Sequence, residues 1–160
     1  MPLNAEQSRK MRMLLWKWGN TLYFVQQKER ELSSLRGLID DAYDTLGAAK
    51  MDGMPNETAK QSSSVENSMA AVQNRISEYE RAQGIIQASI TKALALKEAI
   101  DDAVEVLDPV MQKILRMRYV DDHQWAYIAI MSCYDEGHVR KKEREAVEKL
   151  TTRIKFLLSE

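Results

Sequence analysis

Four cationic side chains lie close together near the end of the chain, at Arg140, Lys141, Lys142 and Arg144. Lysine and arginine can neutralise DNA phosphates, and arginine can also bond the O6 and N7 atoms of guanine. Apolar residues accompany them at helical spacing, so a helix here can pack one face and present charge on the other. The segment from Leu107 to Leu150 therefore holds the strongest functional signal in the chain.

Enzymatic and metal chemistry have little support in the sequence. Cys133 and His138 lie five residues apart without a second pair, and His123 stands alone, so a zinc site would lack ligands. Adjacent acidic residues such as Asp121 and Asp122 point in different directions on a helix, which does not suit acid/base work. The sequence contains no glycine-rich phosphate loop or nucleophile motif. We therefore expect a protein that is not an enzyme and uses no metal or cofactor.

The composition limits the class of protein. The chain has 160 residues, a formal net charge of −1, and only six glycines and three prolines, which favours helices. The single cysteine excludes an internal disulfide framework and suits a reducing compartment. The longest apolar run, from Trp125 to Met131, has seven residues, far fewer than the roughly 20 that span a bilayer. We therefore expect an all-α cytoplasmic protein without a membrane segment.

Two heptad repeats fill the first two thirds of the chain and predict two long helices. The first repeat comprises Met11, Trp18, Val25, Leu32, Ile39 and Leu46. A second position of this repeat is occupied by Leu15, Leu22 and Tyr43 and interrupted by Glu29 and Arg36. The second repeat comprises Val65, Val72, Tyr79, Ile86, Ala93, Ile100 and Leu107. Each helix should bury a narrow apolar stripe against a partner helix.

Residues 47–64 separate the two repeats and hold Gly53, Pro55 and three consecutive serines, which predict a flexible connection. Two long helices joined in this way most simply form an antiparallel, coiled-coil-like hairpin. One or both helices can instead pair with a second copy of the chain. We expect a hairpin that also supports a homodimer, forming a first domain over residues 1–106.

Residues 107–160 form the second predicted domain. Asp108 is a favourable N-cap and Pro109 suits the first helical position, so a helix should begin there. A short helix should follow from about Gln124 to Met131, and after a tight break Asp135 should cap the last helix. Two helices joined by so short a turn predict a helix-turn-helix.

The tryptophans divide between two predicted environments. Trp18 belongs to the first heptad stripe, whereas Trp16 lies off that face. Trp16 can therefore be exposed as a partner surface or pack against the C-terminal domain. Trp125 shares helical spacing with Ile128 and Ala129 and is expected in the core rather than as an exposed stacking group.

The C-terminal domain carries a recognisable pattern of residues. It reads Leu107-Asp108-Pro109, Ile114 to Val120, Trp125, Ile128-Ala129, Tyr134, Glu136, His138-Val139-Arg140, Glu145-Ala146 and Leu150. In this order and spacing the segment resembles region 4 of bacterial sigma factors, and specifically the sigma-like domain of phage-encoded transcription regulators of the ArpU and RinA type. The upstream motif MDGMP, at residues 51–55, followed by Val65-Glu66 before a long helix, is also similar to those regulators.

The chain departs from the family pattern in the turn. The family usually has a hydrophobic residue followed by glycine there, whereas this chain has Ser132 and Cys133. A non-glycine residue at positive φ costs roughly 1 kcal/mol. Ile130 and Met131 replace acidic residues, and Met131 is expected to anchor the reshaped turn. Residues 1–106 show no resemblance to the sigma region that opens promoters, which favours an activator over a stand-alone sigma factor.

The resemblance implies which residues contact DNA. The candidates for base contacts, by their position in the motif, are Glu136, His138, Arg140 and Lys141. Lys142 and Arg144 suit phosphates, Gln124 can anchor the DNA backbone, and Gly137 allows close approach. The competing interpretation is a solvated helix face whose cations pair with Glu143, Glu145 and Glu148.

Two functions follow from these expectations. The first is a phage or prophage transcriptional activator of late genes that binds double-stranded DNA near a promoter, while its long helices dimerise or contact RNA polymerase. The late-gene role is implied only by the resemblance. The second is a protein-interaction or scaffold module that contacts RNA polymerase or a phage packaging protein without sequence-specific DNA binding. The near-neutral charge favours the second function, and the cationic cluster favours the first.

Overall fold

Every regular element that the structure describes is a helix, which confirms the all-α prediction. The computed structural model describes the backbone of residues 3–51 and 59–159 and the side chains of residues 3–48 and 65–159. None of the helices in these ranges is both long and apolar enough to cross a membrane. The elements are α1 (Ala5–Met51), α2 (Ala59–Glu105), α3 (Pro109–Leu115), a π-helix η1 (Arg116–Val120), α4 (Trp125–Ser132), α5 (Glu136–Arg153) and a 3-10 helix η2 (Lys155–Leu158).

The chain divides into two compact units. The core unit comprises Met1–Val25 and Lys92–Glu160, and the hairpin unit comprises Gln26–Thr91. This division differs from the expected boundary after residue 106. The reason is that one end of α1 and one end of α2 pack with the C-terminal helices in a shared hydrophobic core.

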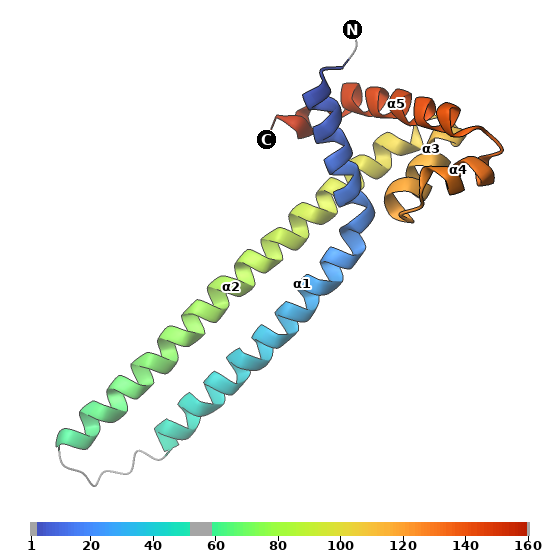
Figure 1. Ribbon diagram of the computed structural model, residues 1–160. Coiled ribbons are helices and arrows are strands. Elements are labelled where there is room, and N and C mark those ends of the chain that lie inside the picture. Colours follow the sequence, from blue (N-terminus) through green and yellow to red (C-terminus); the bar gives the residue numbers. More distant parts are fainter. Residues whose placement is uncertain (1–2, 52–58, 160) are drawn as a thin grey trace. The chain divides into compact units, whose positions relative to one another are not determined.

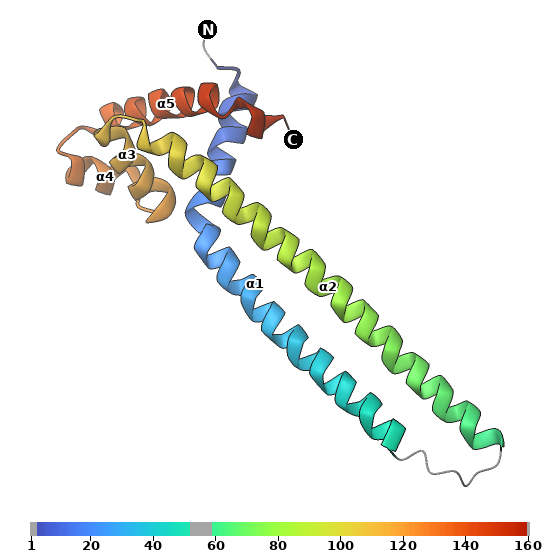
Figure 2. The same cartoon turned by 180° about the vertical axis from the view of Figure 1, so that it is seen from behind.

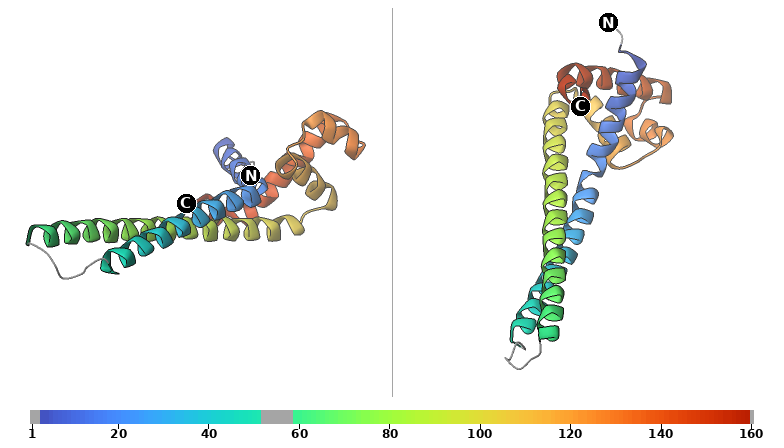
Figure 3. Two further views of the ribbon diagram at one scale, coloured as in Figure 1. Left: turned by 90° about the horizontal axis from the view of Figure 1, so that it is seen from below. Right: turned by 90° about the vertical axis from the view of Figure 1, so that its left-hand side faces the viewer.

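In the hairpin unit, α1 and α2 lie side by side and run in opposite directions (Figures 1 and 3). Leu32 on α1 and Ile76 on α2 are buried in the seam. The Tyr43 hydroxyl donates a 3.2 Å hydrogen bond to Glu80 Oε1 across the two helices. The expected antiparallel hairpin is therefore confirmed, with its apolar stripe and a polar cross-link between Tyr43 and Glu80.

The heptad prediction is accurate for the first position of the first repeat and only partly accurate for its second position, where Leu15 is buried. All members of the first repeat are buried or half-buried, whereas Leu22 and Tyr43 of its second position are exposed. Val65, at the start of the second repeat, is also exposed. A pair of helices covers only a narrow stripe on each partner, which explains why Leu22 and Tyr43 are left in solvent.

The connection between the long helices is shorter than expected. α1 continues to Met51 and α2 begins at Ala59, so both ends of the predicted connection at residues 47–64 are helical. Residues 52–58, which include most of the MDGMP motif, lie outside the described residues.

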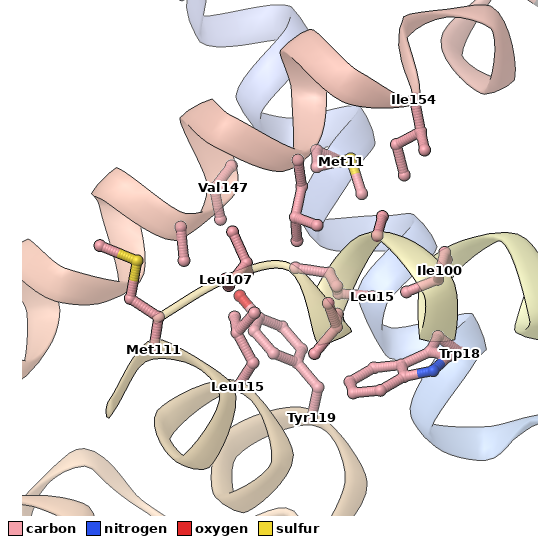
Figure 4. Packing of buried hydrophobic residues seen from close by; sticks show 14 residues of the cluster. Met11, Leu15, Trp18, Ile100, Leu107, Met111, Leu115, Tyr119, Val147 and Ile154 are labelled. Atoms are coloured by element: carbon pink, nitrogen blue, oxygen red, sulfur yellow. The ribbon is translucent and has the colours of Figure 1, made fainter. Parts of the chain in front are cut away.

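The core unit is built around a cluster of buried residues from α1, α2, α3, η1 and α5 and from the residues that follow α2 and α5 (Figure 4). The cluster comprises Met11, Leu15, Trp18, Ile100, Ala103, Val104, Leu107, Met111, Leu115, Tyr119, Ala146, Val147, Leu150 and Ile154. Burying a large apolar side chain stabilises a fold by about 1.5–3 kcal/mol, so this cluster provides the main stabilisation of the unit. A polar contact accompanies it, because Trp18 Nε1 donates a 2.8 Å hydrogen bond to Asp101 Oδ1.

A second, smaller cluster joins α3, α4 and α5, which gather in the core unit (Figure 2). Ile114, Ile128, Ala129 and Val139 are its buried members, and Trp125 packs against them as expected. With the short turn between α4 and α5, this packing forms the predicted helix-turn-helix.

Local capping explains where these helices begin. Asp108 Oδ1 accepts a 2.9 Å hydrogen bond from the Val110 backbone N–H, and Pro109 occupies the first position of α3. Asp135 Oδ1 accepts a 2.7 Å bond from the His138 backbone N–H and caps α5. Both N-caps were expected from the sequence and are confirmed.

The turn between α4 and α5 carries the strain that the sequence predicts. Cys133 ends α4 with φ 58° and ψ 31°, the left-handed conformation in which glycine is favoured. Met131 is 48% exposed and Ile130 is 75% exposed. The expectation that Met131 anchors this turn is therefore wrong, since its side chain faces solvent instead of the core.

One glycine is required by close packing in the core unit. A Cβ atom at Gly19 on α1 would lie 1.7 Å from the carbonyl oxygen of Tyr119 and 2.5 Å from its carbonyl carbon. The obstructing atoms belong to the backbone and cannot rotate away. Gly19 therefore lets α1 approach η1 directly.

Candidate nucleic-acid interface

α5 buries one face and presents most of the predicted DNA-contacting residues on the others. Val139, Ala146, Val147 and Leu150 are buried. The exposed members of the predicted set are Gln124, Glu136, Gly137, Arg140, Lys141 and Arg144, and the half-buried members are His138 and Lys142. The residues therefore lie where a ligand can reach them, although their roles in DNA contact stay predictions.

These residues do not share a single face. A helix advances 100° per residue, so Arg140 and His138 lie about 160° apart around the axis of α5. Lys141 lies between them, directly opposite the buried stripe. The His138 ring stacks on Tyr134, with 4.6 Å between ring centroids, whereas Gly137, Arg140 and Arg144 turn toward a pocket. Lys141 is thus the centre of the exposed face.

The cations of α5 differ in their pairing. Arg140 Nη2 lies 2.7 Å from Glu136 Oε1, and Lys142 Nζ lies 3.7 Å from Glu145 Oε2. Among the described residues, Lys141 and Arg144 form no ion pair. Exposed pairs of this kind stabilise a protein by less than about 1 kcal/mol, so a bound phosphate can replace either carboxylate.

The pocket that Arg140 and Arg144 line is a concave site of about 450 Å³ within the core unit. We call it the arginine pocket. Its lining consists of Arg12, Trp16, Arg118, Tyr119, Trp125, Gly137, Arg140, Glu143 and Arg144. Four arginines, from α1, η1 and α5, therefore line the arginine pocket together with one carboxylate, Glu143.

Glu143 is the buried anion of this pocket and is only 3% exposed. Arg12 donates to both of its carboxylate oxygens, from Nε at 2.9 Å and from Nη2 at 3.0 Å. The Tyr119 hydroxyl donates a third hydrogen bond, at 2.7 Å, to Glu143 Oε1. The competing interpretation, in which Glu143 pairs with cations of its own helix, therefore does not hold for this residue, because Glu143 faces the core and binds residues of α1 and η1.

The Glu143 cluster shifts the titration of its partners. Hydrogen bonds to Glu143 raise the pKa of Arg12 above its ordinary value, although burial opposes this effect. Burial raises the pKa of the Tyr119 hydroxyl, and the neighbouring Glu143 carboxylate raises it further. Arg12 therefore stays charged and Tyr119 stays neutral, so the cluster holds a fixed donor pattern around the carboxylate.

Arg118 lies between two tryptophans at the wall of the arginine pocket. Its Cζ atom is 4.7 Å from the ring centroid of Trp125 and 5.4 Å from that of Trp16. Its Nη1 donates a 3.0 Å hydrogen bond to the His123 carbonyl oxygen. Trp16 also contacts Tyr119 edge to face, at 4.8 Å between centroids. Of the two alternatives for Trp16, packing in the core unit is therefore the one observed.

Sequence reasoning did not find Arg12, Trp16 or Arg118 as members of this site. A signal was available, because Arg12 and Trp16 are four residues apart and share a helix face next to the heptad stripe. Nothing local, however, indicated that this face meets α5.

The comparisons with known proteins give a family. A model described as "Protein of unknown function (DUF722)" matches residues 35–152, more than half of the chain. The chain belongs to this family. The DUF722 match includes α3, α4 and α5 and begins after Arg12 and Trp16. No curated protein and no solved structure matches the chain.

Within the ranges that the structure describes, no group of three or more histidine, cysteine, aspartate or glutamate side chains could hold a metal ion. Cys133 is a free, exposed thiol.

Proposed function

We propose that this DUF722 protein is a DNA-binding transcriptional regulator whose α5 enters the major groove. The observation that carries the proposal is the exposure of Lys141 and Arg144, which form no ion pair with any described residue, on a helix whose opposite face is packed in a helix-turn-helix. Such a helix can approach bases with its first turns while its cations neutralise phosphates.

Individual roles follow from the positions on α4 and α5. Arg140 can bond guanine O6 and N7, and Glu136 can accept from cytosine N4 once their mutual ion pair opens. Lys141 lies beside this pair and His138 lies on the far side of Lys141, and both are further candidates for base contacts. Gln124 precedes α4 with an exposed side chain that makes no capping hydrogen bond, which leaves its amide available to the DNA backbone.

The broader role rests on the resemblance to phage regulators of the ArpU and RinA type. It suggests a phage or prophage activator of late genes that acts in the cytoplasm near a promoter. In this role the long α1–α2 hairpin offers a surface for a second copy of the chain or for RNA polymerase. Exposed heptad residues such as Tyr43 and Val65 support that surface.

Selection of bound sequences from a random duplex pool by the purified full chain tests the proposal. We expect enrichment of a defined motif by the wild type and loss of that enrichment when Arg140 and Lys141 are both changed to alanine. Lys149→Ala, which removes a cation from the exposed surface of the same helix, is the matched control and should retain the motif. Equal enrichment by wild type and double variant would refute the assignment of α5.

One observation favours the alternative of an interaction module without sequence-specific DNA binding. α4 and the turn that follows expose a group of large apolar side chains, Tyr127, Ile130, Met131 and Tyr134. Exposed apolar patches often mark contacts with proteins, such as RNA polymerase or a phage packaging protein. Absence of any enriched DNA motif, together with loss of a protein partner in Ile130→Asp, would favour this alternative.

A further inference from the structure

The arginine pocket has a surplus of positive charge. Four arginines line it, whereas Glu143 is the single carboxylate in the lining. Glu143 already accepts hydrogen bonds from Arg12 and Tyr119 and is almost fully buried, so little of its charge is left for the other arginines.

The positive charges of the remaining three guanidinium groups are only weakly balanced by nearby carboxylates. Arg118 is bonded to a backbone carbonyl oxygen and two aromatic rings and has no carboxylate partner among the described residues. Arg144 forms no ion pair there either, and the partner of Arg140 is the solvent-exposed Glu136. Like charges gathered in one concavity with aromatic walls create a positive potential that attracts an anion.

The guanidinium groups and tryptophan rings that line the pocket determine which kind of anion it can bind. Guanidinium is planar and presents paired N–H donors that match the oxygens of a phosphate. The tryptophan faces are not free for a base, because Arg118 lies against both rings and Arg140 lies 5.6 Å from the Trp125 centroid. The pocket is thus suited to a phosphate group and not to a stacked nucleobase.

We propose that the arginine pocket binds one phosphate group, with Arg118 and Arg144 as its ligands, Arg140 as a further lining cation and the Arg12–Glu143 pair as a fixed wall. The phosphate comes either from the backbone of bound DNA or from a free phosphate ion. The first source rests on the proposed function and brings the beginning of α1 next to DNA. The second source is independent of it.

Titration of the full chain with inorganic phosphate tests the pocket itself. Two of the three tryptophans line the pocket, so intrinsic fluorescence reports its occupancy. At constant ionic strength, with chloride as the compensating ion, we expect a saturable change in the wild type. Arg144→Gln should weaken binding about tenfold, because one charge-assisted hydrogen bond is lost.

Arg144→Gln is a low-risk variant for folding, since the side chain is exposed and unpaired in the structure. Lys149→Gln is the matched control, because it removes an exposed cation of α5 outside the pocket, and its affinity should equal that of the wild type. Absence of a saturable response in the wild type, or equal affinity in Arg144→Gln, would overturn the proposal.

DNA-binding measurements on the same variants identify the source of the phosphate. If a backbone phosphate occupies the pocket, Arg144→Gln should reduce the salt dependence of DNA binding by about one ion, and inorganic phosphate should compete with DNA more strongly than chloride. If phosphate binds while DNA binding is indifferent to it, the ligand is free phosphate. A chain that binds phosphate but no DNA would contradict the proposed function and leave the pocket assignment standing.

Discussion

The same heptad repeats run through the core unit and the hairpin unit, but their apolar residues are buried more deeply in the core unit. Met11, Trp18 and Ile100 are almost fully buried in the core unit, because C-terminal helices cover the seam between the ends of α1 and α2. In the hairpin unit, Ile39 and Tyr79 occupy equivalent heptad positions and stay half-exposed. Periodicity therefore reports which face packs, whereas the number of covering elements decides how deeply it is buried.

The polar contacts follow the same division. In the core unit, Glu143 is held by three hydrogen bonds in a buried site. In the hairpin unit, the hydrogen bond between Tyr43 and Glu80 lies at the surface, where that bond raises the pKa of the Tyr43 hydroxyl. Matched substitutions in the two units should therefore change the free energy of unfolding most differently where the core unit buries tightly packed backbone or a charged side chain.

The largest contrast is expected between two glycines of α1. Gly19→Ala should destabilise the core unit by about 3 kcal/mol or more, because the added methyl group would collide with the backbone of Tyr119. Gly37→Ala in the hairpin unit meets nothing within 4 Å and should instead stabilise α1 by about 0.5–1 kcal/mol. Urea unfolding followed by tryptophan fluorescence and circular dichroism measures both. Similar effects at the two positions would contradict the comparison.

The enclosed charge of the core unit should have the next largest effect. Arg12→Ala leaves the buried Glu143 carboxylate with the Tyr119 hydroxyl as its remaining partner and should cost about 3 kcal/mol. Tyr43→Phe, which removes an exposed polar cross-link of the hairpin unit, should leave the free energy of unfolding nearly unchanged. Chemical denaturation of both variants provides the test, and an Arg12→Ala cost below that of Tyr43→Phe would show that the cluster is not structural.

A smaller change in the free energy of unfolding is expected when Asp101 is protonated as the pH falls. Burial would raise its pKa, but hydrogen bonds from Lys97 and Trp18 outweigh burial and lower the pKa below the ordinary value of 3.8. The stabilisation it provides is therefore complete above that value and is lost as the pH falls through the folded-state pKa. Because Asp101 is partly exposed, the loss should be less than about 1 kcal/mol.

The measurement for Asp101 is the free energy of unfolding between about pH 5 and pH 2. Asp101→Asn should remove part of the acid-induced loss in the core unit. An unchanged pH profile in the variant would exclude the role assigned to this carboxylate.

The smallest effect is expected at the strained turn. Among the described residues, non-glycine residues with positive φ occur only at Asp122 and Cys133, both in the core unit. Cys133→Gly should stabilise the protein by about 0.5 kcal/mol, since relief of strain exceeds the entropy gained by the unfolded chain. Cys133→Ala keeps the strain and should not stabilise, so equal thermal midpoints for the two variants would contradict this explanation.

The elements of the core unit were predictable because their signals are local. The Asp108-Pro109 pair and Asp135 set the beginnings of α3 and α5, and the strain at Cys133 followed from the missing glycine. The pairing of Arg12 with Glu143 was not predictable, because 131 residues separate them and both also have plausible local partners. The assignment of α5 residues to bases and phosphates stays a prediction.

In the proposed function, DNA binding depends on α5 of the core unit and not on positive charge in general. The most direct test is the affinity for a selected duplex, measured over a range of salt concentrations for two double variants of equal charge loss. Arg140→Ala with Lys141→Ala should weaken binding at least tenfold and flatten its salt dependence. Arg36→Ala with Arg75→Ala, at exposed positions of the hairpin unit, should leave affinity within about twofold. Equal losses in the two double variants would contradict the account.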